Sequence, residues 1–211
     1  MSSMHWVHAL SYGIVKMIVR GIVKVIFLVK VEGVENIPEQ GGVIFASNHL
    51  SFFDPPTVAA VSPRNVNFLA KDELFKGPVT SAIMKWMLAF PVKRGSSDRQ
   101  AVRKSIDTLH DGNVLLIFPE GTRKTGGRLV KIERGIGLIA IKSNVPVIPI
   151  YIQGKYKLFR SVTIKFGKPF DVAQDALSNQ HKRDDTDLAV NLIWSRMREL
   201  MEESQTGSAS H

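Results

Sequence analysis

The chain has 211 residues, with 28 Lys and Arg against 19 Asp and Glu, a formal charge of +9, and no cysteine. Disulfides, thiolate metal sites and a cysteine nucleophile are therefore excluded. The hydrophobic content of 44% and charged content of 22% are typical of a globular rather than a disordered chain. The positive charge favours anionic partners, which include nucleic acid, anionic lipid and phosphorylated substrates.

Residues 1–28 predict a helical segment that lies in a membrane interface. Lys16, Arg20 and Lys24 recur every fourth residue and form one basic stripe, apolar residues fill the remaining surface, and Trp6 and Tyr12 add amphipathic rings. The same cations interrupt the apolar stretch, so it does not predict a membrane-spanning helix, and no secretory signal is evident. The alternative is a helix that packs on the core and leaves a solvated basic edge.

Residues 29–203 alternate between apolar strands and helices. Short apolar runs predict strands at 43–47, 65–70, 89–92, 114–118, 147–152 and 162–166, and helical patterns occur from Pro55 onward and at 78–88, 98–110, 134–142 and 190–201. This order predicts an α/β fold with a mixed, mostly parallel central sheet covered by helices on both faces. Pro146 and Pro149 indicate an edge strand or a bent entry. Residues 204–211 are small and polar and predict a disordered tail.

The loop after the strand at 43–47 carries a histidine and an aspartate five residues apart, His49 and Asp54. Ligands of such sheets bind at the loops that leave the strand ends. If the loop folds back, the Asp54 carboxylate can fix the tautomer of the His49 imidazole, which leaves the other ring nitrogen as a general base. Asp54 also suits the N-cap of the next helix, with Pro55 at the first position. From spacing alone, an ordinary loop histidine beside a capping aspartate explains the pattern equally well.

The loop after the strand at 114–118 combines an acid, a glycine, a hydroxyl and a guanidinium, at Glu120, Gly121, Thr122 and Arg123. An arginine can bind a phosphate with two hydrogen bonds, and a glycine lets backbone N–H groups approach a ligand. Taken alone, the pattern slightly favours a Pro/Gly turn with solvated charges. The strand at 89–92 also ends in two cations, Lys93 and Arg94.

Four short sequence blocks follow one another along the chain: Asn-His-x4-Asp at 48–54, Phe-Pro-Val-Lys-Arg at 90–94, Phe-Pro-Glu-Gly-Thr-Arg at 118–123 and Val-Pro-Val-Ile-Pro-Ile at 145–150. In this order they resemble the four blocks of the lysophosphatidic acid acyltransferase family. The resemblance covers residues 25–170, and the first and third blocks together make it specific. It implies that His49 is the general base and that Asp54 orients it. It also implies an acceptor site formed by Arg94, Glu120, Gly121, Thr122 and Arg123, with the arginines on the phosphate and positive charge added by Lys71.

The same resemblance implies transfer of a fatty acyl group from an acyl-carrier-protein or coenzyme A thioester to the sn-2 hydroxyl of 1-acyl-glycerol-3-phosphate, which gives phosphatidic acid. We expect direct transfer, because the chain has neither a cysteine nor a Gly-x-Ser-x-Gly elbow. No cofactor is expected beyond this co-substrate. We also expect no metal, because the six histidines show no pair with metal-ligand spacing backed by carboxylates. The protein is expected on the cytoplasmic face of the cell membrane as a peripheral or monotopic protein that contacts the lipid surface.

Three alternatives stay open. One is an acyltransferase of the same superfamily that acts on another lysophospholipid, glycerol-3-phosphate or an amino-acid lipid. A second is a non-catalytic basic protein bound to membranes; nucleic acid is not expected as a partner, because aromatic residues make up only 8% and none is interleaved with a basic cluster. A third is a hydrolase that gives the acyl group to water, which analysis of the products would separate.

Overall fold

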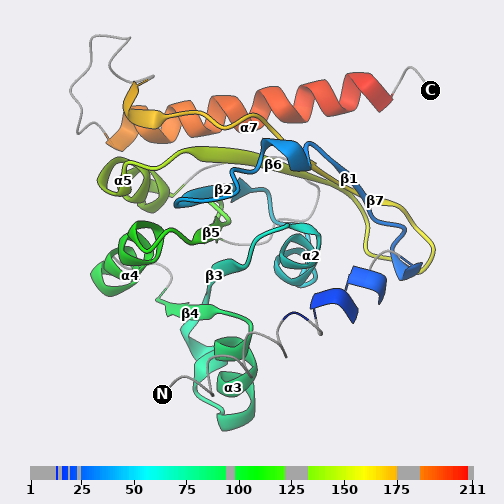
Figure 1. The fold of residues 1–211 in the computed structure, drawn as a ribbon, viewed down its shortest axis with the longest axis horizontal. Helices are drawn as coiled ribbons and strands as arrows, with labels where there is room; N and C mark the ends of the chain where they lie inside the picture. The colour runs from blue at the N-terminus through cyan, green and yellow to red at the C-terminus, as the bar shows by residue number, and fades with distance from the viewer. Residues whose placement is uncertain are drawn as a thin grey trace.

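One seven-stranded sheet runs through the part of the chain that the computed structural model describes, which comprises residues 13, 16–18, 20–22, 25–93, 98–121, 133–174 and 186–208. In spatial order the strands are β1 (Lys30–Glu32), β7 (Val162–Phe166), β6 (Val147–Gly154), β2 (Val43–Ser47), β5 (Val114–Ile117), β3 (Val66–Lys71) and β4 (Ala89–Val92) (Figure 1). All described neighbours pair in parallel except β6 and β7, which form an antiparallel hairpin. The predicted mixed, mostly parallel sheet is confirmed.

Helices cover both faces of the sheet, as predicted. On one face lie α2 (Asp54–Val61) and α3 (Pro78–Trp86), and on the other lie α4 (Arg99–His110), α5 (Arg134–Ser143) and α7 (Thr186–Ser208) (Figure 1). The side chains of β2 alternate between the two layers: Phe45 packs in the same cluster as Val58 of α2, whereas Ile44 packs with Ile139 of α5. Two short 3-10 helices, η1 (Val34–Asn36) and η2 (Asp72–Phe75), complete the connections.

Strand β2 lies at the centre of the sheet and is buried at every position. It pairs in parallel with β5 and with β6, and its register joins Ala46 to Ile117 on one side and Ser47 to Ile150 on the other. Parallel neighbours end at the same edge of the sheet, so the loop after β2 emerges beside the loop after β5. The two loops that carry the polar sequence patterns are therefore brought together by the topology.

The expectation of an edge strand at the proline-rich run was wrong, because β6 lies inside the sheet between β7 and β2. The alternative expectation, a bent entry into this strand, stays a prediction. Pro149 is tolerated there because it lies at a break in the pairing. The ladder with β7 begins at Ile150, and on the other side of Pro149 a separate bridge joins Val147 to Phe170. The Pro149 carbonyl still accepts a hydrogen bond from Gly167 N, at 2.8 Å.

Strand β1 was not predicted from the sequence. The predicted end of the C-terminal helix was too early in the chain. Helix α7 continues to Ser208, beyond residue 204 where we expected a disordered tail. Small hydroxyl residues do not stop it, because the Ser204 Oγ donates back to the Leu200 carbonyl at 2.6 Å within the helix. Residues 209–211 lie outside the described part of the chain.

The N-terminal segment is helical at its described residues up to Ile26. The Lys16 Nζ donates to the Arg64 carbonyl at 2.9 Å, and burial, followed by repulsion from Arg20, lowers the pKa of Lys16. The first cation of the expected stripe therefore faces the protein, while apolar side chains such as Met17 and Ile22 are exposed. The membrane-interface role of residues 1–28 stays a prediction, since 1–12, 14, 15, 19, 23 and 24 lie outside the described residues. Within the described chain, none of the helices combines the length and apolarity that crossing a membrane requires.

Candidate active site

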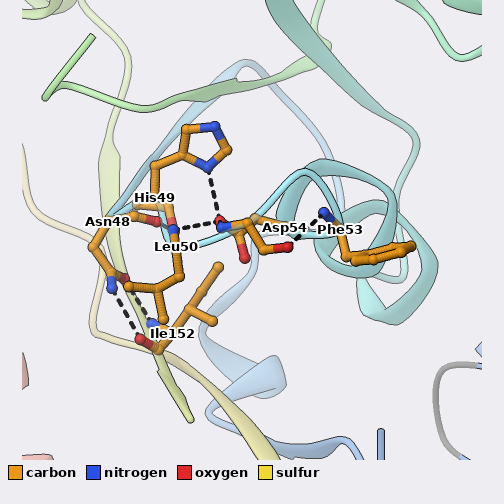
Figure 2. Close-up of polar contacts among 8 residues, drawn as sticks. Asn48, His49, Leu50, Phe53, Asp54 and Ile152 are labelled. Carbon is orange, nitrogen blue, oxygen red and sulfur yellow. Dashed lines mark hydrogen bonds and ion pairs between the residues drawn. The ribbon is translucent and has the colours of Figure 1, made fainter. Parts of the chain in front are cut away.

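The structure brings His49 and Asp54 together at the carboxyl edge of the sheet. The His49 Nδ1 lies 2.7 Å from the Asp54 Oδ2, and the second ring nitrogen points away from the carboxylate (Figure 2). Asp54 is fully buried and His49 is only 7% exposed. A carboxylate at this position accepts the proton on Nδ1, so Nε2 carries the lone pair of the neutral ring. The predicted pairing is confirmed, and its geometry suits a general base.

Asp54 is held by the loop that it closes rather than by the helix that it begins. Its Oδ2 also accepts hydrogen bonds from the backbone N–H groups of Leu50 and Ser51, at 2.6 and 2.7 Å. The expected N-cap role was wrong: α2 starts at Asp54 itself, Phe53 takes the cap position, and no side-chain cap bond is formed there. The carboxylate turns back toward the preceding loop, and this places the imidazole.

Asn48 anchors the other side of the loop. Its side-chain amide donates to the Ile152 carbonyl at 2.9 Å, and its Oδ1 accepts from the Ile152 N–H at 2.7 Å (Figure 2). The regular pairing of β2 with β6 ends at Ser47 and Ile150, so the Asn48 side chain continues that ladder after the main chain has turned away. His49 is thus fixed between a buried amide clamp and a buried carboxylate.

The loop after β5 begins against the histidine. The Phe118 ring stacks on the His49 imidazole with centroids 4.0 Å apart and an interplanar angle of 23°. Of the predicted acceptor residues on this loop, Glu120 is buried and Gly121 has a φ of 66°, in the left-handed region that favours glycine. The Pro119 carbonyl accepts a 2.7 Å hydrogen bond from Glu133 N, which joins the two ends of the segment between them. Thr122 and Arg123 lie in that segment, outside the described residues.

The remaining predicted positions are not brought to the histidine by any described contact. Lys71, at the end of β3, forms an exposed ion pair with Glu73 at 3.2 Å. Arg94 lies outside the described residues, but both ends of its loop are held by one side chain: the Asp98 carboxylate accepts from Lys93 N at 2.9 Å and from Ala101 N at 3.0 Å. These bonds lower the pKa of Asp98.

Sequence reasoning missed a group of buried oxygen atoms behind Asp54. The Asp54 Oδ1, the Thr57 Oγ1 and the Tyr156 hydroxyl are buried near one another, and none has a partner that meets hydrogen-bond geometry. Burial, followed by the negative charge of Asp54, raises the pKa of Tyr156 far above its usual range. Tyr156 therefore keeps its proton beside the Asp54 carboxylate. It follows β6 in a loop that no motif marks.

Described His, Asp and Glu side chains form no group of three that is arranged to hold a metal ion. Because parts of the chain lie outside this description, the expectation that the protein uses no metal stays a prediction.

Known proteins resemble this chain in sequence over most of the described fold. The profile of the Acyltransferase family matches residues 28–153. The 1-acyl-sn-glycerol-3-phosphate acyltransferase of Bacillus subtilis is 31% identical over 154 residues, which cover 70% of this chain and 76% of that protein. The chloroplastic 1-acyl-sn-glycerol-3-phosphate acyltransferase LPAT1 of Arabidopsis thaliana is 31% identical over 135 residues, which cover 63% of this chain and 38% of that protein.

A solved structure shares the fold. The 1-acyl-sn-glycerophosphate acyltransferase PlsC of Thermotoga maritima superposes with a TM-score of 0.72 at 23% sequence identity, over 96% of this chain and 84% of that one. The family profile spans more than half of the sequence, and the chain therefore belongs to the acyltransferase family. The matched segment spans only 38% of the chloroplast relative, so that protein has extensive sequence without a counterpart in the alignment.

Proposed function

We propose that the protein transfers a fatty acyl group from a thioester to the sn-2 hydroxyl of 1-acyl-glycerol-3-phosphate, which yields phosphatidic acid. The observation that carries this proposal is the 2.7 Å contact between the His49 Nδ1 and a fully buried Asp54 carboxylate, with Nε2 directed away from it. Such a pair is a general base for a hydroxyl group. Relatives named as 1-acyl-sn-glycerol-3-phosphate acyltransferases support the choice of acceptor.

In the proposed reaction, the acceptor oxygen bonds to the thioester carbonyl carbon while the His49 Nε2 removes the hydroxyl proton. Asp54 stabilises the imidazolium that forms, because its charge lies on the Nδ1 side of the ring. The tetrahedral species then breaks its C–S bond, and the thiolate takes the proton from the imidazolium. The products are the new ester and the free thiol. No covalent acyl-enzyme is required.

The acceptor phosphate is proposed to bind to Arg94 and Arg123, with Glu120, Gly121 and Thr122 shaping the loop around it. Two features support this placement: Phe118 sets the start of one loop directly against His49, and the Asp98 carboxylate ties together the ends of the other. Lys71 is proposed only as a source of positive charge, since it is exposed and paired with Glu73. The donor is proposed to be an acyl-carrier-protein or coenzyme A thioester, with no further cofactor, at the cytoplasmic face of the membrane.

The test is an acyl-transfer assay in detergent micelles with 1-acyl-glycerol-3-phosphate and each of the two thioester donors. We expect the wild type to form phosphatidic acid and His49→Ala to be slower by about 10²–10⁴-fold. His110→Ala is the matched control, because His110 ends α4 and its Nε2 lies 3.3 Å from the Ser143 carbonyl of α5, on the face of the sheet opposite α2. A His49→Ala variant that transfers acyl groups as fast as the wild type would refute the mechanism.

The products decide among the alternatives. Free fatty acid in place of phosphatidic acid would indicate a hydrolase. Transfer to glycerol-3-phosphate or to another lysolipid, but not to 1-acyl-glycerol-3-phosphate, would keep the reaction class and replace the acceptor. Failure to transfer to any of these acceptors from either donor would overturn the proposal.

A further inference from the structure

The tip of the hairpin between β6 and β7, residues 155–160, alternates cations with large apolar side chains. Its sequence is Lys-Tyr-Lys-Leu-Phe-Arg, and the side chains of Leu158 and Phe159 are 65% and 68% exposed. Lys155, Lys157 and Arg160 are exposed on either side of them. Side chains of this size are rarely left in water next to one another without a partner surface.

The backbone of the tip holds Phe159 outward. Phe159 has a φ of 55°, which is unfavourable for a bulky aromatic residue, and its N–H donates to the Ile26 carbonyl at 2.9 Å. The next turn is closed by Arg160 N, which donates to the Lys157 carbonyl at 3.0 Å. A strained conformation that displays an aromatic ring to solvent is of the kind that proteins keep at functional surfaces.

The tip is continuous with apolar side chains from two other segments. Phe159 and Val162 both donate backbone hydrogen bonds to the end of the N-terminal helical segment, at Ile26 and Phe27. The Phe27 ring contacts those of Phe53 and Tyr156, with centroids 5.3 and 5.2 Å apart. We call the resulting surface the apolar face; its exposed members are Val25, Leu28, Phe52, Phe53, Leu158 and Phe159.

The apolar face borders the catalytic pair. Phe53 immediately precedes Asp54, and Tyr156 lies beside the Asp54 carboxylate while its ring packs on Phe53 at 5.7 Å. Figure 1 shows the β6–β7 turn and the N-terminal helical segment at the same side of the molecule. A lipid that is held at this face would therefore lie next to the loop that carries His49 and Asp54.

We propose that the apolar face is the membrane-docking surface, and that the hairpin tip inserts Leu158 and Phe159 among the acyl chains of an anionic bilayer. The chemistry favours lipid over a protein partner: the apolar side chains are flanked by Lys155, Lys157 and Arg160, whose long stems can reach lipid headgroups while their charges pair with phosphates. The inference rests on the proposed function, since it explains how a lipid acceptor is delivered to His49. The hairpin tip adds a membrane contact outside the N-terminal segment of residues 1–28.

The test is co-sedimentation of the 211-residue chain with vesicles of phosphatidylcholine alone or mixed with phosphatidylglycerol. The first variant combines Leu158→Ser with Phe159→Asn, because asparagine tolerates a positive φ and the fold is kept. We expect its partitioning to fall about tenfold or more on both vesicle types. Leu138→Ser, at an exposed leucine of α5 on the opposite face of the sheet, is the matched control and is expected to bind like the wild type.

The electrostatic part has its own pair of variants. Lys155→Gln with Lys157→Gln should weaken binding to the anionic vesicles by about fivefold for each charge and leave binding to neutral vesicles nearly unchanged. Arg103→Gln with Lys168→Gln removes two exposed cations, one from α4 and one from the segment just after β7, and is expected to have little effect. Equal losses in the two pairs would show a general charge effect and overturn the assignment of the tip.

A second readout separates this inference from the proposed function. With a short-chain lysophosphatidic acid kept monomeric in solution, the Leu158→Ser, Phe159→Asn variant should transfer acyl groups at the wild-type rate, and only the reaction with vesicle-embedded acceptor should slow. If the wild type binds vesicles through the tip but transfers no acyl group, the proposed function is refuted and the membrane-docking surface is still supported. The membrane assignment would be overturned if the variant bound vesicles as well as the wild type does. It would also be overturned if the substitutions abolished a concentration-dependent dimer rather than vesicle binding.

Discussion

Replacement of Asn48 by alanine tests whether the clamp beside the histidine is as important as its geometry indicates. The substitution leaves both the N–H and the carbonyl of Ile152 without their partners, in a residue that is 1% exposed. Each buried backbone group left unpaired costs about 1–3 kcal/mol, so the free energy of unfolding should fall by about 2–6 kcal/mol. For a chain of this size the melting temperature should drop by about 5–20 °C.

Thermal unfolding followed by circular dichroism in detergent measures the loss, and the acyl-transfer assay at a temperature well below the transition measures the effect on His49. We expect transfer to fall by at least tenfold even where the variant is folded, because the imidazole is no longer held against Asp54. Asn67→Ala is the matched control: the Asn67 amide makes one hydrogen bond, to the Val114 carbonyl at 3.2 Å, and the variant should lose about 1 kcal/mol and keep its activity. Equal losses in the two variants would refute the reasoning.

Three further substitutions test other contacts. Tyr156→Phe removes the hydroxyl beside Asp54 Oδ1, so kcat should fall about five- to tenfold with KM unchanged; an equal rise in KM would place Tyr156 in substrate binding instead. Gly42→Ala drives a Cβ into the Leu109 carbonyl and should cost about 1–3 kcal/mol in a denaturant titration, whereas Gly135→Ala in α5 meets nothing and should be neutral or stabilising. Asp98→Ala removes the α4 cap and should cost about 0.5–2 kcal/mol and raise KM for the phosphate acceptor.

The stability difference between the wild type and Asp98→Ala should also depend on pH. The folded-state pKa of Asp98 lies below its unfolded value, so the carboxylate contributes its full stabilisation above the unfolded pKa of about 4. That contribution is lost as the pH falls through the lowered folded-state pKa. Denaturant titrations should therefore give a constant difference from pH 7 down to about 5 and a shrinking one in acid. A difference that grows in acid would contradict the assigned interaction.

The features predicted correctly from the sequence are those that depend on residues close together in the chain. The strands at 43–47, 89–92 and 162–166 have the boundaries expected from their apolar runs, and the pairing of His49 with Asp54 follows from a loop only a few residues long. The direction of the Asp54 side chain was not predictable, because a helix cap and the backbone N–H groups of Leu50 and Ser51 compete for the same oxygen atoms. Local pattern cannot decide that competition.

What the sequence could not supply are the contacts made across the fold. The clamp from Asn48 to Ile152 joins residues 104 positions apart, and Tyr156 reaches Asp54 from the same distant part of the chain. The strand at 147–152 was expected, but Pro149 led us to place it at an edge of the sheet. A proline without an N–H is tolerated inside the sheet where the pairing with the neighbouring strand is interrupted, and that depends on how the strands are assembled. A single sequence carries no signal for contacts between such distant residues or for the order of strands in the sheet.

The position of β2 between β6 and β5 has a consequence for how the candidate active site is assembled. The histidine and its carboxylate are made early in the chain, but the strands on both sides of β2 and the amide partner of Asn48 come from its second half. A fragment that ends before β5 carries the whole His-x4-Asp motif and yet lacks what holds it in place. The chain divided in the connection between α4 and β5 should therefore give two inert fragments, and recovery of acyl transfer on mixing would report their reassembly directly.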